Sequence, residues 1–263
     1  MTTYVLIACS KSKSVDTPVE LEWTEDTQLS SWGKIWFSQE SLIKAEDLYT
    51  GRSFTSQKEI ISDRKNTSLM IISAGAGLVS ANDMIPSYEA TFLKGKGPKS
   101  EDWHQLPKGG LDNLVLEKGD IVISFAPPKY HEALVHDPNI NSIKGNLVVA
   151  STSPLASIAS SVVDVHPRTK EVLAVASSDL NTELFRLYFT EGFEGFKRVS
   201  FEAENLPPKV KRRRVSDEEL LDLVNSLNSI NSLSKLVRYL RDDLKIKASV
   251  ERISAARKLA TGE

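Results

Sequence analysis

Two short segments of the sequence carry the side chains best suited to chemistry. The first, residues 9–13, reads Cys-Ser-Lys-Ser-Lys and combines hydroxyl donors with mobile positive charge. The second begins as a Gly-rich stretch at residues 73–79 and continues to two carboxylates and a phenol. Together they could hold an anionic phosphate on one side and activate a water molecule on the other. The candidate catalytic side chains of the second segment are Asp83, Tyr88 and Glu89.

The first segment is a candidate phosphate grip. It follows an apolar run typical of a buried strand, and ligands of open α/β sheets collect beyond the carboxyl ends of such strands. It lacks the glycine pattern of a P-loop, and a solvated lysine loop would fit the same residues. In the second segment, two glycines allow a close approach of the backbone to a ligand. The substrate-binding candidates are Ser10, Lys11, Ser12, Lys13, Ser73 and Gly75, with Tyr49 and Trp103 as aromatic rings.

A third cluster lies later in the chain. His166 could polarise a leaving base or contact a phosphate, and Arg168 could clamp one. Asp179 is a candidate acid and also a candidate helix N-cap. A lone histidine beside proline is more often a structural residue, so both interpretations stay open. The histidines lack the spacing of metal ligands, and we expect no metal and no cofactor.

The elements that must position these clusters follow from the apolar pattern. Strands are predicted over residues 4–8, 69–72, 120–125 and 146–150. Helices are predicted over residues 38–47, 54–63, 128–136 and 179–190. This alternation predicts an α/β fold with a largely parallel central sheet flanked by helices. Parallel strands end at one edge of a sheet, so the first two clusters should meet there.

A charged connector that contains two prolines divides the chain. We expect an α/β catalytic domain at 1–204, a basic linker at 205–215 and a helical domain at 216–263. From residue 209 onward, 13 Lys and Arg stand against 8 Asp and Glu, whereas the remaining residues hold 20 against 27. A basic appendage on an acidic body favours binding to a polyanion, with double-stranded DNA as the leading partner.

Three helices are predicted in the C-terminal domain, over residues 217–228, 233–244 and 250–259, with Ser216 as the N-cap of the first. Such a unit is typical of a helix-turn-helix-like nucleic-acid-binding domain, although a helical oligomerisation cap would also fit. The candidate DNA-binding residues are Lys209, Lys211, Arg212, Arg213, Arg214, Arg252, Arg257 and Lys258.

Composition excludes several classes of protein. The 263 residues contain no apolar run long enough to span a membrane and no start typical of a secretion signal, so we expect a cytoplasmic protein without a membrane partner. The single cysteine, Cys9, cannot form an internal disulfide or a cysteine-rich zinc site. A buried structural thiol is the simpler interpretation of Cys9.

Several motifs together resemble a known family. They are the strand-terminal opening at 9–13, Ala-x-Asp-Leu-Tyr-Thr-Gly at 45–51, Ser-Ala-x-x-Gly-Leu-Val at 73–79, and Asp-x-Ile-x-x-Tyr-x-x-Thr at 83–91. This set is similar to proteins of uracil-DNA-glycosylase-like fold, which are related to the domain accompanying archaeosine tRNA synthases. The resemblance covers roughly residues 4–200 at low identity.

The sequence departs from that family at three places. Ser12 interrupts the paired lysines of the opening, and Glu89 stands where an aspartate is more usual. Residues 14–40 form a long insertion that carries three of the four tryptophans. This insertion could shape a lid for a bulky base substituent, or it could serve packing alone.

Within the family, an acidic α/β body with a basic helical tail is similar to phage-defence DNA glycosylases that remove glucosylated hydroxymethylcytosine from viral DNA. The resemblance implies base flipping and hydrolysis of an N-glycosidic bond, which leaves an abasic site. Glu89 or Asp83 would orient water and stabilise the oxocarbenium-like sugar. Two alternatives remain open: a base-exchange or nucleotide-processing enzyme of deazaguanine-type modification, and a non-catalytic DNA-binding protein.

Overall fold

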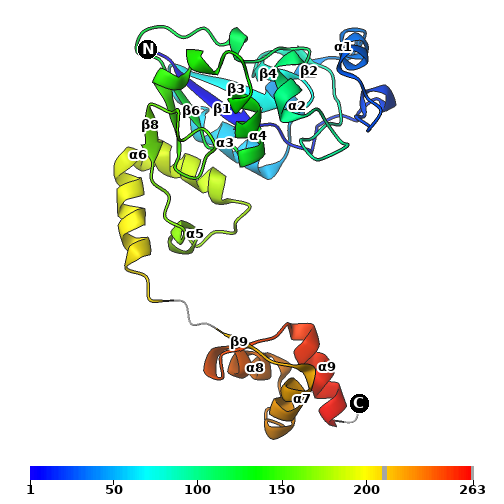
Figure 1. Cartoon of the computed structure of the whole chain (residues 1–263), viewed down its shortest axis with the longest axis vertical. Helices are drawn as coiled ribbons and strands as arrows, with labels where there is room; N and C mark the ends of the chain where they lie inside the picture. Colours follow the sequence, from blue (N-terminus) through cyan, green and yellow to red (C-terminus); the bar gives the residue numbers. More distant parts are fainter. Residues whose placement is uncertain (209–211, 262–263) are drawn as a thin grey trace. The chain divides into compact units, whose positions relative to one another are not determined.

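The computed structural model describes residues 1–208 and 212–261 (Figure 1). The chain forms two compact units, Met1–Asn205 and a C-terminal unit that starts at Leu206. The division falls at the start of the expected linker, and residues 213–215 already belong to the fold of the C-terminal unit. Two of the candidate DNA-binding residues, Lys209 and Lys211, lie outside the described residues.

The N-terminal unit is built on a six-stranded sheet of order β4-β3-β1-β6-β7-β8. All neighbouring strands are parallel except β4, which runs antiparallel to β3 at one edge. The strands are β1 (Thr3–Ala8), β3 (Thr67–Ser73), β4 (Gly77–Ser80), β6 (Ile121–Ser124), β7 (Leu147–Ala150) and β8 (Ser161–Val163). The prediction of an α/β fold with a largely parallel sheet is confirmed.

The helices of this unit are α1 (Leu29–Phe37), α2 (Ala45–Leu48), α3 (Arg52–Ile61), α4 (Pro128–Val135), α5 (Thr169–Val172) and α6 (Leu180–Glu204). The prediction of a helix over 38–47 is wrong for residues 38–44, and only its last three residues lie in α2. The polar run after Phe37 offers no apolar face, and Ile43–Lys44 instead forms β2, which pairs with β5 (Met84–Ile85). Helix α6 extends beyond the predicted end and is kinked at Gly192, where φ is 61°. Among the described residues, no helix has the length and apolar character needed to cross a membrane.

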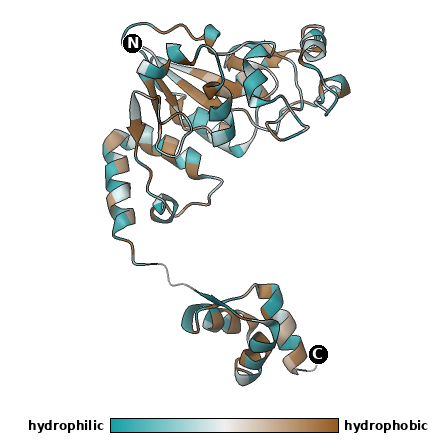
Figure 2. Cartoon of the chain, in the orientation of Figure 1, coloured by the Kyte–Doolittle hydropathy of each residue, from teal (hydrophilic) through white to brown (hydrophobic). Residues whose placement is uncertain are grey.

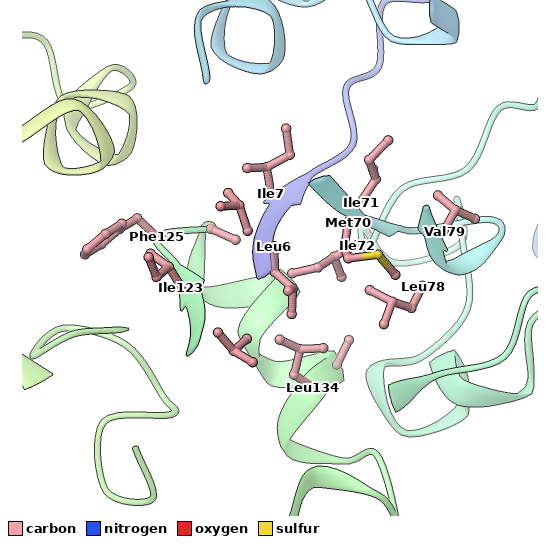
Figure 3. Packing of buried hydrophobic residues seen from close by; sticks show 14 of the residues in the cluster. Leu6, Ile7, Met70, Ile71, Ile72, Leu78, Val79, Ile123, Phe125 and Leu134 are labelled. Atoms are coloured by element: carbon pink, nitrogen blue, oxygen red, sulfur yellow. The ribbon is translucent and has the colours of Figure 1, made fainter. Parts of the chain in front are cut away.

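Both faces of the central strands are buried. Successive side chains of a strand point to opposite faces, and Leu6 and Ile7 of β1 are both at most 1% exposed. Figure 3 shows Leu6 on the side of Leu134 from α4, with Ile7 on the other side of the sheet. This double burial explains the unbroken apolar runs that predicted the strands, which appear brown in Figure 2.

The C-terminal unit has a separate core, in which Leu220, Leu236 and Ile253 pack together. Its elements are β9 (Arg213–Arg214), α7 (Asp217–Ser226), α8 (Leu233–Arg238), a π-helical turn (Tyr239–Asp243), β10 (Ile246–Lys247) and α9 (Val250–Thr261). Ser216 caps α7 as predicted, because its hydroxyl accepts a hydrogen bond from Glu219 N at 3.1 Å. The parallel pair β9–β10 was not expected from the sequence.

Candidate active site

The carboxyl ends of β1 and β3 lie side by side and position the candidate site. The register pairs Ala8 with Ile72, so β1 runs into the cationic loop beside the end of β3. Cys9 N donates to the Ile72 carbonyl at 3.1 Å, and the half-buried Cys9 thiol lies 3.6 Å from the Tyr130 hydroxyl. β6 borders β1 on its other side, so the strand order reverses between β1 and β6, and ligands of open α/β sheets bind at the carboxyl edge beside such a reversal.

Backbone contacts hold the cationic loop against the segment before α3. Ser10 Oγ accepts a hydrogen bond from Gly51 N at 3.0 Å and donates to the Ser12 carbonyl at 2.6 Å. Thr50 N donates to the same carbonyl at 3.0 Å. The Ser10 side chain therefore organises the loop, and a direct contact between Ser10 and the substrate stays a prediction. The Ser12 side chain is exposed.

Glu89 lies between two lysines. One carboxylate oxygen is 3.8 Å from Lys11 Nζ, and the other is 3.8 Å from Lys13 Nζ. The three side chains differ in exposure: 78% for Lys11, 39% for Glu89 and 5% for Lys13. We call Lys11, Lys13 and Glu89 the charged trio. It combines an exposed cation, a half-exposed carboxylate and a buried amine.

Lys13 is held in an unusual environment for an ammonium group. Its Nζ lies 4.8 Å from the centroid of the Tyr88 ring and donates to the Lys11 carbonyl at 3.3 Å. Burial lowers the pKa of Lys13 below its ordinary value, against the opposing effects of Cys9 and Glu89. A larger fraction of this amine is therefore neutral than for an exposed lysine.

Beneath the charged trio lies a chain of buried hydroxyl groups, which we call the hydroxyl floor. The Tyr88 hydroxyl is 2.7 Å from the Tyr49 hydroxyl and 2.5 Å from Ser73 Oγ, which accepts a hydrogen bond from Ala76 N at 2.9 Å. All three side chains are at most 2% exposed. Burial raises the pKa of both phenols, so they stay protonated. All three side chains thus support the site. Tyr49 and Ser73 are too buried for the substrate contacts expected of them, and Tyr88 is too buried for the catalytic role expected of it.

Two further candidate substrate contacts also serve packing. A Cβ at Gly75 would lie 2.4 Å from the Tyr88 ring, so glycine is required for this contact with the floor. Trp103 is fully buried, and its indole N–H donates to the Ser73 carbonyl at 2.8 Å. Trp32 of the insertion donates similarly to the Gly75 carbonyl at 2.7 Å. The indoles satisfy buried carbonyls of the turn, and the Trp103 ring cannot stack on a base.

Asp83 does not join Glu89. Because β4 runs back along β3, the turn that contains Asp83 lies toward the amino edge of the sheet. Asp83 accepts a hydrogen bond from Ser80 N at 2.8 Å and lies 3.7 Å from Lys108 Nζ. Of the two carboxylates that the sequence left unranked, only Glu89 lies in the charged trio.

The third cluster is also separate. His166 and Arg168 follow β8, and β6 and β7 lie between that strand and β1. His166 Nδ1 accepts a hydrogen bond from Arg168 N at 3.1 Å, and the Arg168 guanidinium lies 3.1 Å from the Glu171 carboxylate. Asp179 forms an ion pair with Arg52 at the start of α3 and makes no side-chain cap of α6. The contacts of His166 and Arg168 are local, whereas Asp179 pairs with a residue distant in the chain, and none of the three pairs with the charged trio.

A surface groove of about 860 Å³ opens beside Glu89 and Lys11, with Trp23 of the insertion in its wall. It shares Trp23 and several neighbouring residues with a second hollow of about 930 Å³. The two hollows form a continuous depression that leads away from the charged trio. This depression is large enough for a nucleotide and its flanking backbone.

Residues 93–100 supply cations to this depression that our sequence interpretation missed. Lys94 and Lys96 line the first hollow, and Lys94 and Lys99 line the second. All three are exposed, and none pairs with a carboxylate within the described parts of the chain. The run Lys-Gly-Lys-Gly-Pro-Lys was the available signal, since it combines positive charge with a flexible backbone.

A second polar network, also missed, lies at the carboxyl ends of β6 and β7. His131 of α4 is 1% exposed, with Nε2 at 2.8 Å from Ser124 Oγ and Nδ1 at 2.6 Å from Ser153 Oγ. Ser124 donates to the Leu6 carbonyl at 2.9 Å, so it accepts from Nε2–H, and Ser153 donates to Nδ1. Burial lowers the pKa of His131 to about 4, and the ring is neutral. We call this the histidine network.

Most of the candidate DNA-binding arginines in the C-terminal unit form contacts within that unit. Arg252 donates to the Val215 carbonyl at 3.0 Å and pairs with Asp217, and Arg257 donates to the Asn231 carbonyl at 2.6 Å. The other two pairs are Arg212 with Asp242 and Arg213 with Glu219. These contacts tie α7, α9 and the β9 segment together, so much of the expected positive charge is partly neutralised.

Several exposed cations of this unit form no ion pair among its described residues: Arg214, Lys235, Arg238, Lys245, Lys247 and Lys258. Arg214 of β9 lies opposite Lys247 of β10 in the strand register, and Lys258 lies on α9. Like charges placed opposite each other repel, and a bound anion would relieve this repulsion.

Within residues 1–208 and 212–261, no group of three or more His, Cys, Asp or Glu side chains is arranged to hold a metal ion.

Comparison with known proteins gives a match over part of the candidate site, which leaves out Lys11 and Lys13 of the charged trio. No curated protein and no solved structure matches the chain. The matched segment begins at Ser38 and ends with β7, so it includes Glu89, the hydroxyl floor and His131 but neither α6 nor the C-terminal unit. Over residues 38–150 the chain is similar to a family of unknown function, DUF6884.

Proposed function

We propose that the protein is a DNA glycosylase that hydrolyses the N-glycosidic bond of a modified base and leaves an abasic site. Glucosylated hydroxymethylcytosine in phage DNA is the first candidate substrate, and antiviral defence is the corresponding role. The observation that carries the proposal is the position of Glu89, half-exposed between two lysines at the wall of a large groove.

Glu89 suits the chemistry of this reaction. Cleavage of the glycosidic bond develops positive charge on the sugar and negative charge on the departing base. A carboxylate held on a packed support can stabilise the sugar and orient the attacking water. Lys11 is exposed beside it and can stabilise the anionic base or a neighbouring phosphate.

The depression beside the charged trio is lined by carboxylates such as Glu22 and Glu25 as well as by lysines, and in the proposal the lysines contact the DNA strand. Lys94, Lys96 and Lys99 can follow the phosphates on one side of the depression, while a flipped nucleotide occupies the part beside Glu89. Trp23 borders the same space and can contact a bulky base substituent. The C-terminal unit adds affinity for DNA through its exposed cations.

A direct test uses three duplexes that contain unmodified, hydroxymethylated or glucosylated cytosine. Released base is measured by mass spectrometry, and abasic sites are measured as strand breaks after alkali. We expect release from at least one modified duplex and a loss of roughly 10²–10⁴-fold in rate for Glu89→Gln, the range found when general acid–base groups are removed.

Asp83→Asn is the matched control, because it removes a carboxylate of similar exposure that lies outside the trio. This variant should keep the wild-type rate within a few fold when it is assayed as folded protein. Absence of released base from every duplex, or equal losses in the two variants, would overturn the proposal. Incorporation of a supplied free base without abasic sites would indicate base exchange instead.

A further inference from the structure

We propose that the protein has a second activity, cleavage of DNA at abasic sites through a covalent imine between Lys13 Nζ and the sugar. The proposal rests on the proposed function in one respect, since the abasic site would be the product of base release. It assigns the buried amine of the charged trio a role distinct from that of Glu89.

The geometry places Lys13 where such a reaction needs an amine. Its Nζ is 3.8 Å from Glu89 Oε2, so a sugar carbon in contact with the carboxylate would lie within a few ångströms of the amine. The backbone around Lys13 is held on both sides, because Thr50 N donates to the Ser12 carbonyl and Ser14 N donates to the Leu48 carbonyl. The amine therefore has a defined position above the Tyr88 ring.

Lys13 lies behind Glu89 and outside the lining of the groove, and it differs from the lysines that line it. Only a neutral amine attacks a carbonyl carbon, and burial is the usual way in which proteins produce one at neutral pH. The side chain of Lys13 is 5% exposed, whereas that of Lys11 is 78% exposed, and Lys94 and Lys96 are exposed as well.

The proposed chemistry is balanced without a cofactor. The neutral amine adds to C1′ of the ring-opened sugar aldehyde, and loss of water with uptake of one proton from solvent gives a protonated imine. Glu89 then accepts a proton from C2′, the C3′–O3′ bond breaks, and the phosphate leaves on the downstream strand. Water hydrolyses the conjugated imine, which regenerates Lys13 and releases an unsaturated aldehyde on the upstream strand.

The test uses the full chain and a duplex in which an abasic site has been prepared beforehand. Incubation without alkali should cut the strand at that site. Addition of borohydride should reduce the imine and leave a stable protein–DNA adduct. After nuclease and protease digestion, mass spectrometry should place the sugar on Lys13. A modification on Lys11, or no adduct with the wild-type protein, would overturn the proposal.

Variants separate the covalent role from a structural one. Lys13→Arg keeps the positive charge above the Tyr88 ring but cannot form the imine, so it should bind abasic DNA and lose both the adduct and the cut. Lys13→Met should lose them too. Lys58→Met is the matched control, since Lys58 is a partly buried lysine that pairs with Glu46 and Asp47 away from the groove. It should form the adduct as the wild type does.

These outcomes distinguish failure of this inference from failure of the proposed function. The prepared abasic duplex bypasses base release, so strand cutting does not depend on finding the right modified base. Base release without an adduct on abasic DNA would refute the role of Lys13 and leave the glycosylase proposal intact. An adduct at Lys13 without base release from any duplex would support the second activity and refute the first. Persistence of the adduct in a folded Lys13→Arg protein would refute the covalent role of Lys13.

Discussion

The two polar networks at the carboxyl edge of the sheet differ in what they leave open. In the histidine network, the ring of His131 and the hydroxyls of Ser124 and Ser153 satisfy one another, and no charged group is present. In the charged trio, Glu89 and Lys11 face a groove, and their ion-pair distances of 3.8 Å are long. A closed network contributes to stability, whereas an open one keeps bonding capacity for a ligand.

The hydroxyl floor shares one property with the histidine network and another with the charged trio. Like the histidine network it is buried and hydrogen-bonded, yet Tyr88 also lies directly below the amine of Lys13. An open site needs such a support, because exposed charged side chains are otherwise mobile. Changes in the closed regions should therefore affect stability first, and changes in the trio should affect activity first.

The largest stability effect that we expect comes from protonation of His131. The pKa is about 4 in the folded protein against 6.5 for an ordinary histidine, so between these values the unfolded chain binds the proton and the folded chain does not. Stability should therefore fall as the pH falls from 6.5 toward 4, by about 3 kcal/mol in total. Urea unfolding at several pH values measures this slope. His131→Gln should lack most of it, and an unchanged slope in that variant would contradict the closed network.

A somewhat smaller effect is expected for Tyr88→Phe. The change removes the central hydroxyl of the floor and leaves Ser73 Oγ and the Tyr49 hydroxyl each short of a buried partner. The expected cost is about 1–3 kcal/mol of unfolding free energy. Tyr4→Phe is the control, because its hydroxyl makes only a long 3.3 Å contact with the Val115 carbonyl at the surface. Equal unfolding free energies for the two variants would mean that the floor is not a support.

The smallest effect that we expect distinguishes two arginines of the C-terminal unit: one that is exposed and one that bonds to other residues of the unit. Arg214→Ala removes an exposed cation opposite Lys247, so the slope of log affinity for DNA against log salt should decrease by about one, the value for one phosphate contact. Arg252→Ala removes a residue that ties α9 to Asp217 and the Val215 carbonyl, so it should lower the thermal stability of the unit. Salt titrations and melting curves of both variants test this. The same salt slope in wild type and Arg214→Ala would exclude that contact.

Local patterns predicted much of the fold. The four longest parallel strands were predicted from their apolar runs, because a strand buried on both faces has no room for polar residues. The helices α3 and α4 lie close to the predicted ranges, and Ser216 caps α7. The short strand β8 was not predicted, and the helix predicted over 38–47 was wrong for most of its length. Elements of two to four residues depend on partners that are distant in the chain.

The sequence alone placed Lys11, Lys13 and Glu89 in candidate segments, because cationic and acidic residues that follow strand ends gather at one edge of a parallel sheet. The direction of β4 was a tertiary choice, and it moved Asp83 away while leaving Glu89 in the trio. Burial was also decided only in three dimensions, since it depends on neighbours far apart in the chain. Because they are buried, Tyr49, Tyr88 and Trp103 support the site from beneath. The amine of Lys13 is enclosed for the same reason.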